Sequence, residues 1–249
     1  MIEVRGLAKS FGDLRVVQDV SFVANDGEIT GLIGPNGAGK TTIFRLICTV
    51  LRSDRGTTVI DGIDSRKDPL AVRRRLGVLP DIRALYTRLT AREHLRYFGA
   101  LHGIARDELE GRIAELVATL RMEDFIDRRA KGFSRGQQMK VALGRALVHQ
   151  PHNVMLDEPT NGLDVATSRA VRDLLRRLRA EGRCILLTSH IMQEVAALAD
   201  RIVILAGGRV VLQGAPGELR RATGLFDLEE IFMAATQEAA TEPVLAAGE

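Results

Sequence analysis

The stretch Gly34-Pro35-Asn36-Gly37-Ala38-Gly39-Lys40-Thr41 decides the fold of this 249-residue chain. It matches the pattern G-x-x-x-x-G-K-[ST], in which glycines let successive backbone N–H groups turn inward around an anion. The apolar segment EITGLI before it reads as a strand, and IFRLICTVL after it reads as a helix. This context predicts a phosphate-binding loop, because a helix N-terminus carries a partial positive charge that favours phosphate.

Two side chains at the end of this loop have predicted roles. Lys40 is expected to reach the β- and γ-phosphates of a nucleotide, and Thr41 is expected to offer its hydroxyl to Mg²⁺. The alternative is a glycine-rich turn that arose by chance. The strand and the helix that flank the loop argue against that alternative, so we expect ATP and Mg²⁺ as ligands.

A second group of polar residues follows two later apolar segments. Val154-Met155-Leu156 reads as a strand that ends in Asp157 and Glu158, and Leu187-Thr188-Ser189 ends in His190. Parallel strands present their carboxyl ends at one edge of a sheet, so these side chains should meet the loop. Asp157 is suited to Mg²⁺, Glu158 to accepting a proton from an attacking water, and His190 to bonding the γ-phosphate. Solvated acids at a helix start and a capping histidine are the alternatives.

The rest of the chain predicts an α/β fold. Residues 1–33 are rich in β-branched residues and read as strands of an N-terminal antiparallel subdomain. Residues from about 81 to 140 show three- and four-residue apolar spacing and read as a helical insert. Helices and short apolar strands then alternate, which predicts a mixed, mostly parallel sheet. Residues 231–249 form a short C-terminal segment, and we expect disorder from Ala234 onward because large apolar residues are few.

Composition narrows the function. Hydrophobic residues make up 45% of the chain, and the net charge of +3 is too small to indicate nucleic acid as a partner. Cys48 and Cys184 lie within apolar runs and read as small buried hydrophobes. No segment has the ~18–20 continuous apolar residues of a membrane helix, and the first residues do not resemble a secretory signal.

The segment Gly132-Phe-Ser-Arg-Gly-Gln-Gln138 lies between the insert and the acidic strand. By itself it reads as a capping Ser134 followed by a helix. Together with the phosphate loop, Asp157-Glu158-Pro159, Asn161–Asp164 and Thr188-Ser189-His190, it resembles the signature of ATP-binding cassette (ABC) ATPases. The resemblance covers roughly residues 1–230, the expected ATPase domain, and implies a P-loop ABC cassette fold.

The resemblance implies further roles. Phe11 stands where an aromatic residue stacks on adenine, with a core Phe as the alternative, and Val16 flanks the base. The Ser134 segment would cap ATP that is bound to a second copy, so two copies would pair head to tail around two ATP molecules. Asn161–Asp164 would cross to that second copy. The resemblance and the loop motif together assign nucleotide binding to Phe11, Val16, Gly34, Pro35, Asn36, Gly37, Ala38, Gly39, Lys40, Thr41, Thr42, Ser134, Gly136 and Gln137.

The sequence departs from the family pattern in two places. Asp81 stands where the family usually has Gln, which contacts Mg²⁺ and the attacking water. A carboxylate still accepts from water or binds Mg²⁺, but it adds a negative charge, so we assign Asp81 both a catalytic and a metal-binding role alongside Lys40, Glu158 and His190. The signature also has Phe133 where the family usually has Leu, and Arg135 where it usually has Gly. The Arg135 side chain either adds a cation beside the phosphate clamp or points to solvent.

The segment LPDIRALYTRLTAREHLRYFGALHG and the ending LFDLEEIFM are similar to the sodium-extrusion (Nat-type) branch of bacterial ABC ATPases, which is close to drug and polysaccharide exporters. The resemblance therefore implies an ATPase that drives export through a separate integral membrane permease. It would sit on the cytoplasmic face of the inner membrane as a peripheral subunit. The alternatives are a soluble ABC ATPase that acts on the ribosome or DNA, and a P-loop switch protein.

Overall fold

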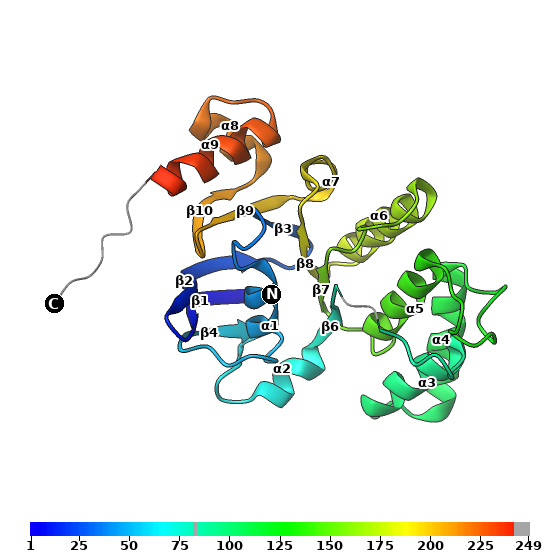
Figure 1. Cartoon of the computed structure of the whole chain (residues 1–249). Coiled ribbons are helices and arrows are strands. Elements are labelled where there is room, and N and C mark those ends of the chain that lie inside the picture. The colour runs from blue at the N-terminus through cyan, green and yellow to red at the C-terminus, as the bar shows by residue number, and fades with distance from the viewer. Residues whose placement is uncertain (82–83, 242–249) are drawn as a thin grey trace.

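The main sheet has six strands in the order β10-β9-β3-β8-β7-β6 (Figure 1). The computed structural model describes residues 1–81 and 84–241. All pairings in this sheet are parallel except that of β9 with β10. The strands are β3 (Ile29–Ile33), β6 (Leu76–Leu79), β7 (Asn153–Asp157), β8 (Cys184–Ser189), β9 (Arg201–Ala206) and β10 (Arg209–Gly214). The expected α/β fold with a mixed, mostly parallel sheet is confirmed.

A second, antiparallel sheet lies at the N-terminal side in the order β2-β1-β4-β5. Its strands are β1 (Ile2–Phe11), β2 (Leu14–Ala24), β4 (Arg55–Ile60) and β5 (Ile63–Asp64). Helix α1 (Lys40–Ile47) follows β3, and its buried Ile43 and Phe44 share one apolar cluster with residues of both sheets, among them Val4 and Leu186. Because α1 is held between the two sheets, the phosphate loop at its start is held there too.

Three helices form the insert, in green in Figure 1: α3 (Ala91–Leu101), α4 (Arg106–Leu120) and α5 (Arg135–Leu147). Two of them begin in capping boxes, in which a hydroxyl and a Glu or Gln side chain exchange hydrogen bonds with the first-turn backbone. These boxes join Thr90 to Glu93 and Ser134 to Gln137. Helices α2 (Pro69–Arg75), α6 (Val165–Ala180) and α7 (Met192–Leu198) complete the core.

Strand β6 approaches the end of α5 closely at Gly77. A Cβ atom there would lie 2.3 Å from the Ala146 carbonyl oxygen and 2.5 Å from Pro151 Cγ. We expect Gly77→Ala to lower the free energy of unfolding by about 1–3 kcal/mol, because the added methyl overpacks this contact. Gly111→Ala is the matched control, since nothing lies within 4 Å of its Cβ position in α4. That variant should gain about 0.5–1 kcal/mol from the higher helix propensity of Ala. Urea unfolding of both checks the prediction, which an unchanged midpoint for Gly77→Ala would contradict.

The C-terminal segment corrects one expectation. Helices α8 (Pro216–Thr223) and α9 (Leu228–Thr241) follow β10. The prediction of disorder from Ala234 onward is therefore wrong for residues 234–241, which belong to α9. Residues 242–249 lie outside the described residues. The helix forms because Ala, Glu, Gln and Met favour helices and because Ile231, 1% exposed, and Phe232 pack against the main core.

Two other expectations concern burial and membranes. Cys48 and Cys184 are buried and free, and burial raises the pKa of the Cys184 thiol to about 12. The prediction of small buried hydrophobic cysteines is confirmed.

Among the described helices, none combines the length and the apolar character that crossing a bilayer requires.

Candidate functional site: a phosphate-binding cleft

The glycine-rich loop joins the end of β3 to the start of α1, as the sequence predicts. Gly39, the residue before the helix, has a φ of 98°, a left-handed conformation that favours glycine. A Cβ atom at Gly34 would lie 2.6 Å from the carbonyl oxygen of Leu205 on β9. Glycine at both positions therefore lets the loop curl tightly over the sheet edge.

Lys40 folds back over this loop. Its Nζ donates hydrogen bonds to the carbonyl oxygens of Gly34 at 2.5 Å and Pro35 at 3.1 Å. The side chain is partly buried, and desolvation lowers the pKa of its ammonium group, while the charges of Glu158 and Asp157 oppose that shift. A partly desolvated cation at the centre of a glycine loop is a favourable site for phosphate oxygens.

Asp157 ends β7 beside the loop, with only 3% of its surface exposed. Thr188 on the neighbouring strand β8 donates its hydroxyl to Asp157 Oδ1 at 2.5 Å, and the two residues are register partners. Burial raises the pKa of Asp157, the Thr188 hydrogen bond opposes the shift, and the charges of Asp81 and Glu158 add to it. A divalent cation would relieve this crowding of negative charge, and an all-oxygen donor set suits Mg²⁺.

Glu158 and His190 form the second polar pair of the site. His190 Nδ1 lies 2.8 Å from Glu158 Oε2, which is hydrogen-bond distance. The Glu158 backbone has a φ of 50°, unusual for a residue with a side chain, and its N–H donates to Thr188 Oγ1 at 3.1 Å. These contacts fix the carboxylate beside a histidine at the carboxyl edge of the sheet, an arrangement suited to proton transfer.

These residues line one cleft of about 460 Å³, within the ~300–1,000 Å³ range of small-molecule sites. The cleft brings together most of the predicted site: Val16, Asn36, Gly37, Gly39, Lys40, Thr41, Thr42, Asp81, Asp157, Glu158 and His190. The other loop residues act differently. Gly34 and Pro35 offer their carbonyl oxygens to Lys40, and the Gly34 and Ala38 residues of the loop are buried.

Sequence reasoning missed the supporting role of Thr188, which does not itself line the cleft, and it gave Asn161 no role in the cleft of its own chain. Thr188 holds both the Asp157 carboxylate and the Glu158 backbone. Asn161 lines the cleft of its own chain, whereas we expected it to cross to a second copy. The sequence could have indicated the role of Thr188, because a buried hydroxyl group at the end of a strand needs a hydrogen-bond partner.

Three predicted nucleotide-binding residues lie outside the cleft, at the start of α5. The Ser134 hydroxyl accepts from the Gln137 N–H at 3.2 Å, and the Gln137 side chain accepts from the Ser134 N–H at 3.0 Å. Gly136 packs on α6, where a Cβ atom would lie 3.1 Å from Thr167 Oγ1. The same segment carries Arg135, which is exposed to solvent and whose guanidinium group lies against Gly162.

Phe11 also lies outside the cleft lining. It ends β1 and is 48% exposed, with Lys9 Nζ 5.6 Å from its ring centroid. The alternative of a core Phe is therefore wrong. An exposed aromatic face is what stacking on a base requires, so adenine stacking at Phe11 stays a prediction.

The fold and the cleft define a P-loop nucleotide-binding protein: a strand–glycine loop–helix unit faces a buried carboxylate and a Glu–His pair. Comparison with known proteins narrows this class. The pattern of the ABC transporter family matches residues 17–161, and "ABC transporter ATP-binding protein NatA" of Bacillus subtilis is 41% identical over 94% of this chain and 97% of that protein. The chain therefore belongs to the ABC transporter family, as an ATP-binding subunit with ATPase activity.

Two further proteins are similar. "Nod factor export ATP-binding protein I" of Bradyrhizobium diazoefficiens is 40% identical over 88% of this chain and 71% of that protein. A solved dimeric bacterial ABC transporter cassette matches with a TM-score of 0.79 at 26% identity, over 86% of this chain and 98% of that chain. Both similarities extend well beyond the phosphate loop, which by itself is shared by many unrelated nucleotide-binding proteins.

Proposed function

We propose that the chain is the ATP-driven motor of an export system, working as a pair of copies at the cytoplasmic face of the cell membrane. One observation carries the pairing. The cleft holds the phosphate loop, the metal carboxylate and the Glu–His pair, but the Ser134 segment lies outside it. A second copy placed head to tail supplies that segment and closes the nucleotide from the open side.

In this proposal, each residue of the cleft has one task. The loop N–H groups and Lys40 bind the phosphates, and Thr41, Asp157 and Asp81 provide the oxygen ligands for Mg²⁺, which would offset phosphate charge. Glu158 accepts the proton of a water as that water attacks the γ-phosphorus. The bond from the γ-phosphorus to the β–γ bridging oxygen breaks, and ADP leaves. His190 donates its Nδ1–H to Glu158, and as an imidazolium it would also donate its Nε2–H to a γ-phosphate oxygen.

The partner copy completes the phosphate shell. Its Ser134 and Gly136 lie at the N-terminus of a 13-residue helix, where backbone N–H groups favour an anion. Negative charge on a γ-phosphate holds the two copies together, and its release lets them separate. The helical insert and the Asp81 loop carry that motion to a membrane permease.

Asp81→Gln tests the departure from the family pattern. We expect ATPase activity to be preserved or raised by up to about fivefold, because the change removes one of the negative charges that crowd Asp157. Asp81→Asn is the matched control, neutral but one methylene shorter. Steady-state phosphate release measures both variants. Complete loss of activity in both would show that the Asp81 carboxylate is itself required.

Export itself is tested with the membrane partner. Co-purification with a multi-span membrane protein, and ATPase activity stimulated by its cargo in inside-out vesicles, are the expected results. The similarity to a relative named for Nod factor export supports the direction. Association with ribosomes or DNA in place of a membrane protein would contradict the proposal and support the soluble alternative.

A further inference from the structure

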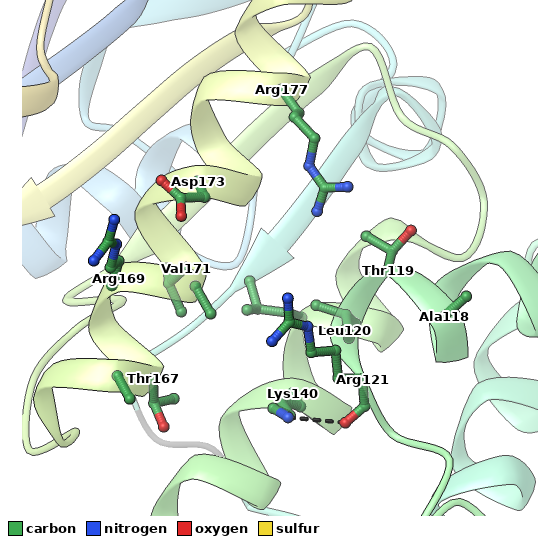
Figure 2. Close-up of a pocket in the computed structure, with 13 residues that line it drawn as sticks. Ala118, Thr119, Leu120, Arg121, Lys140, Thr167, Arg169, Val171, Asp173 and Arg177 are labelled. Atoms are coloured by element: carbon green, nitrogen blue, oxygen red, sulfur yellow. Dashed lines mark hydrogen bonds between the residues drawn. The ribbon is translucent and has the colours of Figure 1, made fainter.

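A second cavity, of about 650 Å³, lies between the helical insert and the core (Figure 2). One wall is formed by the end of α4 and the middle of α5, and the opposite wall by α6. We call it the α4–α6 groove. It shares no lining residue with the nucleotide cleft. The cleft chemistry therefore does not account for its side chains.

The α6 wall of this groove carries cations without carboxylate partners. Of the five arginines on α6, three form ion pairs: Arg172 with Glu194, Arg176 with Asp173, and Arg179 with Asp200. The remaining two, Arg169 and Arg177, line the groove. Neither forms an ion pair within residues 1–81 and 84–241.

The opposite wall adds two more cations. Arg121 follows α4 with a φ of 52°, and its carbonyl oxygen accepts a hydrogen bond from Lys140 Nζ at 2.9 Å. The Arg121 guanidinium is likewise without a carboxylate among the described residues. Figure 2 shows the guanidinium groups of Arg121 and Arg177 turned into the same space from opposite walls. Among the described residues that line the groove, Asp173 is the only acid, and it already pairs with Arg176.

The floor of the groove is apolar. Leu120, Leu143 and Val171 are 7%, 1% and 4% exposed, and the hydroxyl residues Thr119 and Thr167 stand at its sides. Two forked guanidinium groups bind a phosphate with paired hydrogen bonds, and they tolerate contact with a planar apolar group. An apolar floor beneath them accepts the organic part of such a ligand.

We propose that the α4–α6 groove binds a small organic phosphate. Its phosphate lies between Arg121 and Arg177, with Lys140 and Arg169 adding to the positive potential, and its apolar body lies on Leu120 and Val171. This ligand joins the helical insert to the core, because Arg121 belongs to the first and Arg177 to the second. Like charge on the two guanidinium groups opposes a closer approach of the walls, and a bound phosphate would offset that charge.

The groove is connected to the Ser134 segment. Thr167 lines the groove and also lies against Gly136, whose Cβ position is 3.1 Å from Thr167 Oγ1. A ligand that draws the walls together therefore acts on the start of α5. Its effect on ATP turnover rests on the proposed function, whereas its binding does not.

Binding is tested with 1-naphthyl phosphate, whose ring fluoresces. The background is Lys40→Ala, which weakens phosphate binding in the nucleotide cleft. Arg121→Ser/Arg177→Ser in that background should raise the dissociation constant at least tenfold. Arg106→Ser/Arg179→Ser is the control, because it removes one charge from α4 and one from α6 at positions outside the groove. It should leave the constant unchanged. Equal constants in the two double variants, or no binding up to millimolar probe, would overturn the proposal.

A second measurement locates the ligand and keeps the proposal testable if the double variant does not fold. Hydrogen exchange of the Lys40→Ala protein should slow at residues 117–121 and 166–177 when 1-naphthyl phosphate is added. Slowing confined to residues 34–42 would place the probe in the nucleotide cleft and overturn the proposal. Displacement of the probe by a polyglutamate peptide that binds more tightly would also overturn it, in favour of an acidic protein segment.

Discussion

The variant Glu158→Gln is expected to bind ATP with the affinity of the unchanged protein but to hydrolyse it at least about a hundredfold more slowly. The amide keeps the size of the side chain, so the cleft keeps its shape. It cannot accept the proton of the attacking water, and a positioned general base contributes about 10²–10⁴-fold to a rate. Single-turnover phosphate release, beside an equilibrium titration with fluorescent ATP, measures both quantities.

Glu230→Gln is the control for this variant, because Glu230 is exposed on α9, away from the cleft lining. Its hydrolysis rate should match that of the unchanged protein. If Glu158→Gln hydrolyses ATP within tenfold of the unchanged rate, Glu158 is not the base, and the hydrogen bond with His190 serves another purpose.

The variant Lys40→Ala is expected to lose ATP affinity by about a hundredfold or more. Lys40 is the cation inside the glycine loop, and truncating one partner of a partly desolvated charge pair costs on the order of 2–5 kcal/mol. The substitution should not lower the stability of the fold. Burial disfavours the charged ammonium group in the folded protein, as its lowered pKa shows. Among the described residues, the hydrogen bonds that the substitution removes are those that Nζ donates to the carbonyl oxygens of Gly34 and Pro35.

Titration with fluorescent ATP measures this loss, and Lys67→Ala, an exposed lysine outside the cleft, is the control. A change below about fivefold in Lys40→Ala would mean that the loop backbone alone holds the phosphates. The two cleft variants should therefore differ in which step they lose. Lys40→Ala should lose ATP binding, whereas Glu158→Gln should bind ATP but not hydrolyse it.

The sequence was sufficient wherever spacing along the chain determines geometry. The loop from Gly34 to Thr41 and the acids that end β7 belong to short segments whose strand and helix context can be read directly. The parallel order of the strands then brings Asp157 and His190 to the loop, because carboxyl ends share one edge.

Features that depend on pairing between distant segments could not be read in this way. Thr188 holds Asp157 because the two are register partners across β7 and β8. Helix α9 exists because Ile231 packs on the main core, which outweighs the polar composition that suggested disorder. The α4–α6 groove needs Arg121 and Arg177 to face each other across two helices, and nothing in their local sequence distinguishes them from other arginines.

The central claim is that ATP held by one copy is closed by the Ser134 segment of another. Sedimentation velocity of Glu158→Gln with MgATP tests it most directly, together with Glu158→Gln/Ser134→Arg. We predict an ATP-dependent dimer for the first protein and a monomer of similar ATP affinity for the second, since a bulky cation at position 134 obstructs the closing surface. A Glu158→Gln protein that stays monomeric when saturated with ATP, or a dimer that persists with Arg at position 134, would contradict the account.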